Sequence, residues 1–188
     1  MRRMPLLAAL GAAVALTVTG CGNDATQSPT TAPTSEPDSE LNGTSGPPWP
    51  APTDVPARVA AAGLDLGPMG TAEHYHPNLR VVINGTEVPV PPNIGVDAAT
   101  GAMSAVHTHE GDGTIHIEAD TVGEVFTLGQ VFMQWGVKLT PNQIGGVKAP
   151  AGQEVTLTSN GKPVTGDPMD LRLEPEQQIV LELHTDER

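Results

Sequence analysis

Two Asn-Gly dipeptides, each between short runs rich in Val, Ile, Leu and Thr, place the strongest constraint on the fold of this chain. They are Asn84-Gly85 and Asn160-Gly161. Asn and Gly accept the positive φ angles of a two-residue turn, so each dipeptide predicts a β-hairpin. The predicted hairpins join residues 79–83 to 86–90 and residues 154–159 to 162–165. Aromatic residues make up only 3% of the chain, so a core of aliphatic side chains is expected, which favours strands.

One clear helix interrupts these strands. Thr127 and Gln130 have the spacing of a capping box, and an apolar stripe at helical spacing follows until Gly136. The stripe consists of Leu128, Val131, Phe132 and Trp135. We interpret it as core packing and not as a cofactor site. A shorter helix is expected over residues 56–62, capped by Asp54 and stopped by Gly63.

Near the C-terminus, residues 170–173 and 179–183 read as two more strands around a turn that begins at Glu174-Pro175. The sequence therefore predicts an α+β domain of mostly antiparallel strands and hairpins with one central helix. Two Asn-Gly hairpins around one helix resemble a β-grasp fold.

The first 21 residues have the layout of an export signal. Arg2 and Arg3 precede an apolar run over residues 5–18, and small residues lead to Cys21, the only cysteine in the chain. A signal peptide over residues 1–20 is expected, since the apolar run is shorter than the about 20 residues that span a bilayer. Val18-Thr19-Gly20-Cys21 resembles the lipobox of bacterial lipoproteins. The resemblance implies a lipid on Cys21 that anchors the protein to the extracytoplasmic face of the cell membrane; the alternative is an ordinary signal peptide with an unrelated cysteine.

Residues 21–56 are expected to be a disordered tether, because Pro, Ser, Thr and Gly dominate and aliphatic side chains are scarce. Residues 57–188 then form one globular domain. Without residues 1–20 the chain keeps 7 basic against 22 acidic residues, a formal charge of −15. This charge argues against nucleic acid as a partner and suits a cation, although acidic residues also simply keep exported domains soluble.

Histidines carry the most informative pattern. Residues 105–118 read as a hairpin closed by a turn over residues 110–113, in which His107 pairs with His116 and His109 with Thr114. Side chains alternate along a strand, so one face is expected to carry His107, His109, Thr114, His116 and Glu118. Val106, Ile115 and Ile117 are expected on the opposite face, toward the core.

Opposed residues on one face have Cβ atoms about 4.5–5.5 Å apart, so three imidazoles at these positions are able to bind one ion. The sequence thus predicts a metal site of His107, His109 and His116, with Glu118 as fourth ligand or as hydrogen-bond partner of a ligand. The alternative is a hydrogen-bonded polar cluster. His74 and His76 share the His-x-His spacing and are candidate ligands as well, but nothing in the sequence places them beside the others. His184 is expected to be an exposed residue without a role.

Imidazole ligands without thiolates favour Zn²⁺ or Cu²⁺, between which the sequence does not choose. The motif His107-Thr108-His109 superficially resembles the first ligand motif of metallo-β-lactamases, but Gly111 stands where that motif requires Asp. It also resembles the start of a cupin motif, without the expected glutamate. The longer pattern, from the first His-x-His pair to Phe126-Thr127-Leu128, resembles a group of uncharacterised exported, histidine-rich bacterial and archaeal proteins.

Three hypotheses follow. The first is a membrane-anchored lipoprotein whose domain binds a transition metal for uptake, buffering or delivery. The second is a hydrolytic enzyme in which a metal-bound water is the nucleophile. The third is a metal-free domain that docks a partner in the cell envelope. No nucleophilic serine or cysteine with a base partner is recognised in the sequence, so an enzyme is the less favoured hypothesis.

Overall fold

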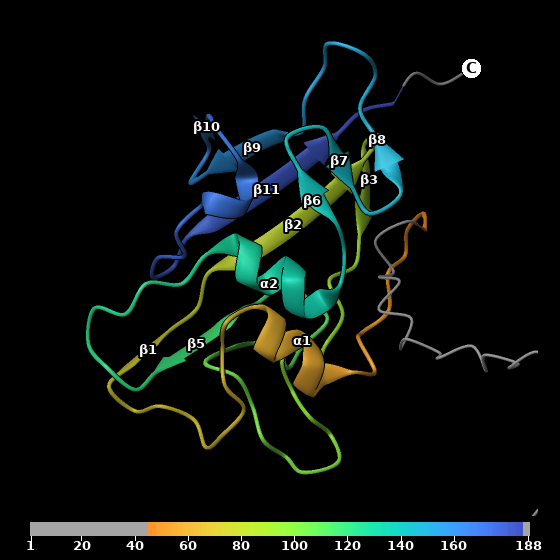
Figure 1. The fold of residues 1–188 in the computed structure, drawn as a ribbon. Coiled ribbons are helices and arrows are strands. Elements are labelled where there is room, and N and C mark those ends of the chain that lie inside the picture. Colours follow the sequence, from red (N-terminus) through yellow and green to blue (C-terminus); the bar gives the residue numbers. More distant parts are fainter. Residues whose placement is uncertain (1–44, 186–188) are drawn as a thin grey trace, which may run out of the picture. The chain divides into compact units, whose positions relative to one another are not determined.

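The centre of the fold is a parallel pair of strands, β2 (Asn78–Ile83) and β11 (Gln178–Leu183). The computed structural model describes residues 45–185. β3 (Thr86–Val88) flanks β2, while β9 (Thr156–Ser159) and then β10 (Lys162–Val164) flank β11, all antiparallel to their neighbours (Figure 1). The strand order is β10-β9-β11-β2-β3, and a helix lies across one face of the sheet. The predicted α+β class is confirmed.

Both Asn-Gly hairpins form as predicted. Asn84 and Gly85 have φ angles of 50° and 75°, and Asn160 and Gly161 have φ angles of 51° and 74°. Two consecutive positive φ angles make a turn whose twist matches that of the flanking strands. Each dipeptide therefore sets the register of one outer hairpin of the sheet.

Helix α2 (Leu128–Trp135) crosses the sheet in front of β2 and β11 (Figure 1). Its capping box is present, since the Gln130 side chain accepts from the Thr127 N–H at 2.9 Å, and Gly136 ends the helix at φ 75°. The predicted apolar stripe is buried in the core. Helix α1 (Val55–Ala61) packs beside α2, and the Asp54 carboxylate pairs with Arg58 and does not cap the helix.

The packed part of the chain begins earlier than the predicted boundary at residue 57. Trp49, assigned to the tether, is 1% exposed and meets Trp135 edge to face at a centroid distance of 5.9 Å. The Trp135 indole N–H lies 3.3 Å and 3.2 Å from the carbonyl oxygens of Trp49 and Pro50. The proline-rich composition gave no sign that this segment packs against the core, because a single large aromatic side chain is enough to fix it there.

Two other parts of the structure differ from the sequence-based expectation. Residues 170–173 form no strand: Asp170 ends the short 3₁₀ helix η2 (Pro168–Asp170), and a single bridge joins Arg172 to Thr127. A small antiparallel sheet was not anticipated, because its strands have only two residues each and no periodicity to read. Its strands are β6 (Leu139–Thr140), β7 (Gln143–Ile144) and β8 (Val147–Lys148).

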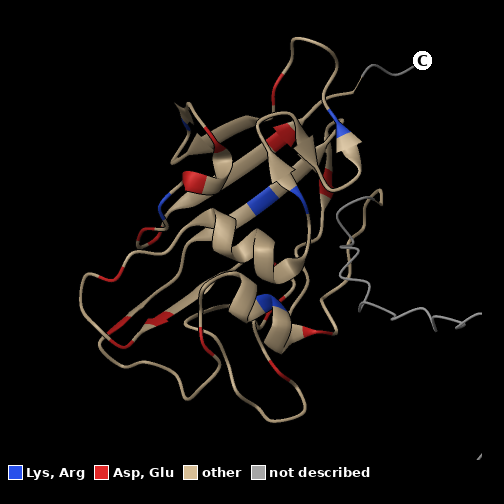
Figure 2. Ribbon diagram, in the orientation of Figure 1, with Lys and Arg blue, Asp and Glu red and all other residues tan. Residues whose placement is uncertain are grey.

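The third sheet carries the histidines. It has the order β1-β5-β4, with β1 (Glu73–Tyr75), β5 (His116–Ala119) and β4 (Val106–His107) all antiparallel. Figure 2 shows acidic residues on the strands and loops of this region, and its three strands contain no Lys or Arg. No helix among residues 45–185 has the length and apolar character needed to cross a bilayer. The predicted signal peptide and Cys21 lie outside the described residues.

Candidate metal centre

The strand register gathers the histidines on one face of the β1-β5-β4 sheet. His107 stands opposite His116, as the sequence predicted, and His74 stands opposite Glu118 on the other side of β5. Opposed residues point to the same side of a sheet, and so do residues two apart along a strand. These four side chains therefore share one face. Val106, Ile115 and Ile117, expected on the core side, are all buried.

The predicted hairpin is shorter than expected, and the pairing of His109 with Thr114 is wrong. Only Val106 and His107 pair with β5. Beyond them the two flanks find different partners, because Thr108 bonds to the backbone of residues 93–94, while Thr114 bridges Asn78. Gly113 allows this departure: its φ is +84°, and a Cβ there would lie 2.1 Å from the Leu79 carbonyl oxygen.

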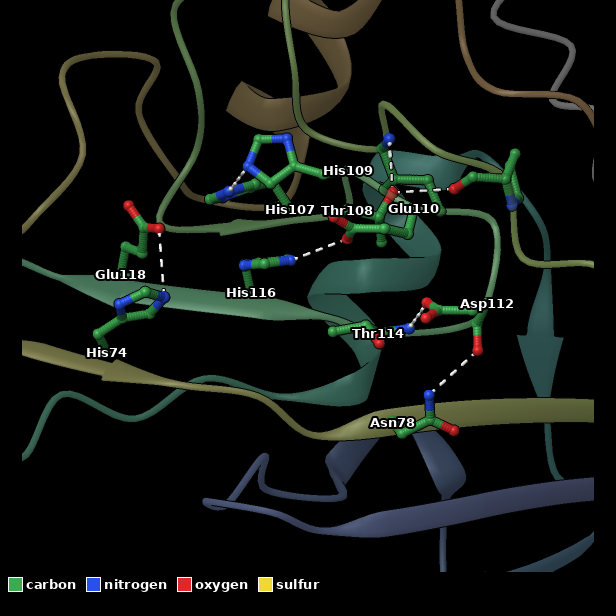
Figure 3. Close-up of polar contacts among 12 residues, drawn as sticks. His74, Asn78, His107, Thr108, His109, Glu110, Asp112, Thr114, His116 and Glu118 are labelled. Atoms are coloured by element: carbon green, nitrogen blue, oxygen red, sulfur yellow. Dashed lines mark hydrogen bonds and ion pairs between the residues drawn. The ribbon is translucent and has the colours of Figure 1, made fainter.

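His107 is the buried member of the cluster, with 1% of its surface exposed. Its Nδ1 lies 2.8 Å from the Ser104 carbonyl oxygen, which only accepts hydrogen bonds, so Nδ1 carries the proton and Nε2 keeps a lone pair. That Nε2 lies 3.0 Å from Nε2 of His109 (Figure 3). Burial, and secondarily the neighbouring His109 and His116, lower the pKa of His107 to about 4. The ring is therefore neutral at physiological pH, as a metal ligand must be.

His116 occupies the middle of the cluster. Its ring stacks on His107 at a centroid distance of 5.4 Å and meets His109 edge-on at 4.8 Å. Its Nε2 lies 3.0 Å from a carboxylate oxygen of Glu110, and its other nitrogen lies at the opposite end of the ring (Figure 3). A carboxylate that holds one imidazole nitrogen orients the other nitrogen as a ligand, which is the usual arrangement around metal-binding histidines.

His74 and His76, whose place the sequence left open, lie on the other side of His116. His76 meets both His74 and His116 edge-on at 4.6 Å. Burial, followed by the charges of His116 and His74, lowers the pKa of His76. Nε2 of His74 lies 3.5 Å from the Glu118 carboxylate, whose side chain is 10% exposed. Five of the six histidines of the chain thus form one cluster.

These side chains form two sets of three whose potential ligand atoms all lie within 4.8 Å of one another. One set is His107, His109 and His116, and the other is His74, His76 and His116. Three imidazoles this close are positioned to hold a metal ion after small side-chain rotations, since Zn–N bonds are about 2.0–2.1 Å long. Glu118 belongs to neither set and contacts His74 instead.

The remaining histidine is separate from the cluster. His184 is 61% exposed and pairs with Glu182 at 3.1 Å, as expected for a surface residue. Sequence reasoning missed two partners of the ligands, the Ser104 carbonyl and the Glu110 carboxylate. A backbone carbonyl leaves no trace in a sequence, whereas the position of Glu110 directly after the His-x-His motif was a usable signal.

No protein-family model, no curated protein and no solved structure matches this chain. The cupin-like start around His107 does not extend to the fold, since the main sheet is a mixed five-stranded sheet with a central parallel pair. The described side chains themselves are therefore the guide to function.

Proposed function

We propose that this domain binds one transition-metal ion through His107, His109 and His116. The observation that carries the proposal is the state of His107: the Ser104 carbonyl holds its Nδ1 proton, and its Nε2 lone pair faces Nε2 of His109 at 3.0 Å. Burying a polar imidazole lowers the stability of the fold, and an apolar side chain at this position would not carry that desolvation cost. A buried, oriented and neutral histidine next to two others is what a metal site needs before the ion arrives.

Zn²⁺ and Cu²⁺ are the ions that this donor set favours. The cluster offers imidazole nitrogens and nearby carboxylates, and borderline divalent ions prefer such nitrogen donors. Ca²⁺ and Mg²⁺ prefer shells of oxygen ligands, which the face does not provide. Of the two candidates, Cu²⁺ generally binds a given nitrogen site more tightly.

We further propose that the domain belongs to a lipoprotein held at the extracytoplasmic face of the cell membrane by lipid on Cys21. The supporting observations are the signal-like residues 1–20, the lipobox-like residues 18–21 and the proline-rich segment that follows. Two acyl chains on one cysteine are enough for stable anchoring. A metal site on such a domain serves uptake, buffering or delivery outside the cytoplasm.

Equilibrium dialysis against Zn²⁺ and Cu²⁺ tests the metal site. The protein is the full-length chain with Cys21→Ser, because a free thiol would itself bind either metal. We expect one ion per chain, and a loss of binding when His109→Gln and His116→Gln are combined. His184→Gln is the matched control, since it removes a histidine outside the cluster and should leave binding unchanged.

Equal uptake by the wild-type chain and the double variant would refute the metal site, and a metal-free interaction domain would then be the better hypothesis. If the bound ion also carries an exchangeable water and the loaded protein hydrolyses ester or phosphoester substrates, the second hypothesis of an enzyme gains support. Water relaxation measured on the Cu²⁺ form reports that exchange directly.

The anchor has its own test. We expect the wild-type chain, expressed in a bacterium, to incorporate labelled fatty acid and to sediment with membranes. Cys21→Ser should lose the label. Label that persists in this variant would place any lipid elsewhere and contradict the role of Cys21.

A further inference from the structure

The two sets of three histidines overlap in a single residue. His116 belongs to both, while His107 and His109 lie on its β4 side and His74 and His76 on its β1 side. The overlap follows from the sheet, because β5 is the central strand and His116 has a histidine neighbour across each strand gap. Two complete sites would need His116 to serve two ions at once.

His116 has only one ring nitrogen available to bind a metal ion. Its Nε2 lies 3.0 Å from the Glu110 carboxylate, which accepts the proton on that nitrogen. As a metal ligand, His116 then has one lone pair to donate, on Nδ1, at the end of the ring away from Glu110 (Figure 3). One lone pair binds one ion, so the two sets compete for the same donor atom.

The two sets differ in one buried member, since His109 in the inner set is exposed like His74 in the outer set. His107 in the inner set is 1% exposed, whereas the His74 side chain in the outer set is 55% exposed. The outer set has a carboxylate beside it, because Glu118 is 10% exposed and its contact with His74 is 3.5 Å long. A mostly buried carboxylate whose partner nitrogen lies 3.5 Å away is only weakly compensated, and an arriving cation would compensate it better.

We propose that the cluster holds one ion at a time in two overlapping positions, an outer one at His74, His76 and His116 and an inner one at His107, His109 and His116. His116 stays bound while the other ligands exchange, so the ion moves between solvent and the position beside the buried His107 without losing all its protein ligands. This inference rests on the proposed metal-binding function. It assigns the site to exchange of the ion with solvent or a partner, as opposed to permanent storage.

Calorimetric titration with Zn²⁺ alone tests the proposal on the full-length chain with Cys21→Ser. The wild-type cluster, the outer-set variant His74→Gln/His76→Gln and the inner-set variant His109→Gln should each bind one ion. Association constants of mutually exclusive sites add, so the loss of the weaker position lowers the affinity by about twofold or less. His116→Gln should lower it on the order of 100-fold or more, since loss of a mere partner of a ligand already costs about 10–100-fold.

Release kinetics provide the second measurement. Transfer of Zn²⁺ to excess EDTA should be slower from His74→Gln/His76→Gln than from the wild-type chain, because the ion then lacks its outer position. His184→Gln should release the ion at the wild-type rate. All of these replacements are at exposed or half-buried positions, and circular dichroism checks that each variant folds.

Two ions bound per wild-type chain would overturn the inference while leaving the proposed metal binding intact. So would unchanged release from the outer-set variant, or no binding at all by the inner-set variant. No Zn²⁺ or Cu²⁺ bound to the wild-type chain would instead remove the proposed function itself.

Discussion

The five-stranded sheet and the histidine sheet are built in opposite ways. The first has a central ladder of six consecutive pairs between β2 and β11, and two tight turns close its outer hairpins. The second is held by three pairs on one side of β5 and two on the other. Neighbouring segments provide the other backbone hydrogen bonds of this region: residues 77–79 and 93–94 bond to the backbone next to the short strands.

The difference places stability and chemistry in separate parts of one domain. The inner face of the five-stranded sheet is apolar, with Leu79, Val81, Ile179 and Leu181 each at most 1% exposed. The histidine sheet buries the polar groups His107 and Glu118, and Thr108 directly after β4 is buried as well. Burying polar groups lowers the stability of the fold, so apolar burial in the five-stranded sheet must offset this cost of the histidine sheet. The following experiments test this division, in order of decreasing effect.

The largest effect is expected from core truncation, where Leu181→Ala and Ile117→Ala form a matched pair. Both residues are 0% exposed, one in β11 and the other in β5 between His116 and Glu118. Each should lower the free energy of unfolding by about 2–5 kcal/mol in urea. Only Ile117→Ala should also weaken Zn²⁺ binding by the folded protein. Equal weakening by Leu181→Ala would show that the two sheets are not separable.

Acid should weaken the metal-free domain through His107. Its folded pKa is about 4 and its reference value is 6.5, so between these values the unfolded chain binds a proton that the folded chain does not. The contribution is complete above pH 6.5 and is lost as the pH falls to 4, by about 3 kcal/mol. His107→Asn should lack this part of the pH dependence in urea unfolding. Identical pH profiles for both proteins would contradict it.

A bound metal ion should stabilise the histidine sheet, whose strand pairing is shorter than that of the five-stranded sheet. An ion that binds only the folded chain raises its stability by about 2.7 kcal/mol at a free concentration 100 times Kd. Thermal unfolding with and without Zn²⁺ should show this gain in the wild-type chain and little of it in His116→Gln. A similar gain in His116→Gln would place the bound ion elsewhere.

The smallest effect is expected at a turn of the five-stranded sheet. Asn160 has a φ of 51°, and Asn tolerates this left-handed conformation better than Ala does. Asn160→Ala should cost about 1 kcal/mol in urea unfolding, with Zn²⁺ affinity unchanged. A change in affinity would reveal coupling between β9 and the histidines across the core.

The sequence predicted the local parts of the fold and not its long-range pairing. The Asn-Gly turns and the capping box of α2 are set by residues close together in the chain, so each was predicted correctly. The parallel pairing of β2 with β11 joins residues about a hundred positions apart, and no local signal specifies it. Residues 170–173 alternate polar and apolar side chains like a strand. In the structure Asp170 instead ends η2, and the backbone of residues 171 and 173 bonds to that of residues 128 and 126.

The site shows the same limit. The pairing of His107 with His116 followed from the turn between them, and the structure confirms it. His74 and His76 joined the cluster through β1, which pairs with β5 across about forty residues of chain. The position of His109 was right for the wrong reason: it reaches His107 from a loop and not from a paired strand.

The buried Trp49 matters for any truncation of the chain at residue 57, where the proline-rich segment ends. A fragment beginning at residue 57 would lose the ring that fits over Gly145, where any Cβ would lie 2.3 Å from the indole. It would also remove the two oxygens near the Trp135 indole N–H and leave that donor facing an empty slot. Such a fragment should aggregate or bind hydrophobic dyes, whereas one beginning at residue 45 keeps the slot filled.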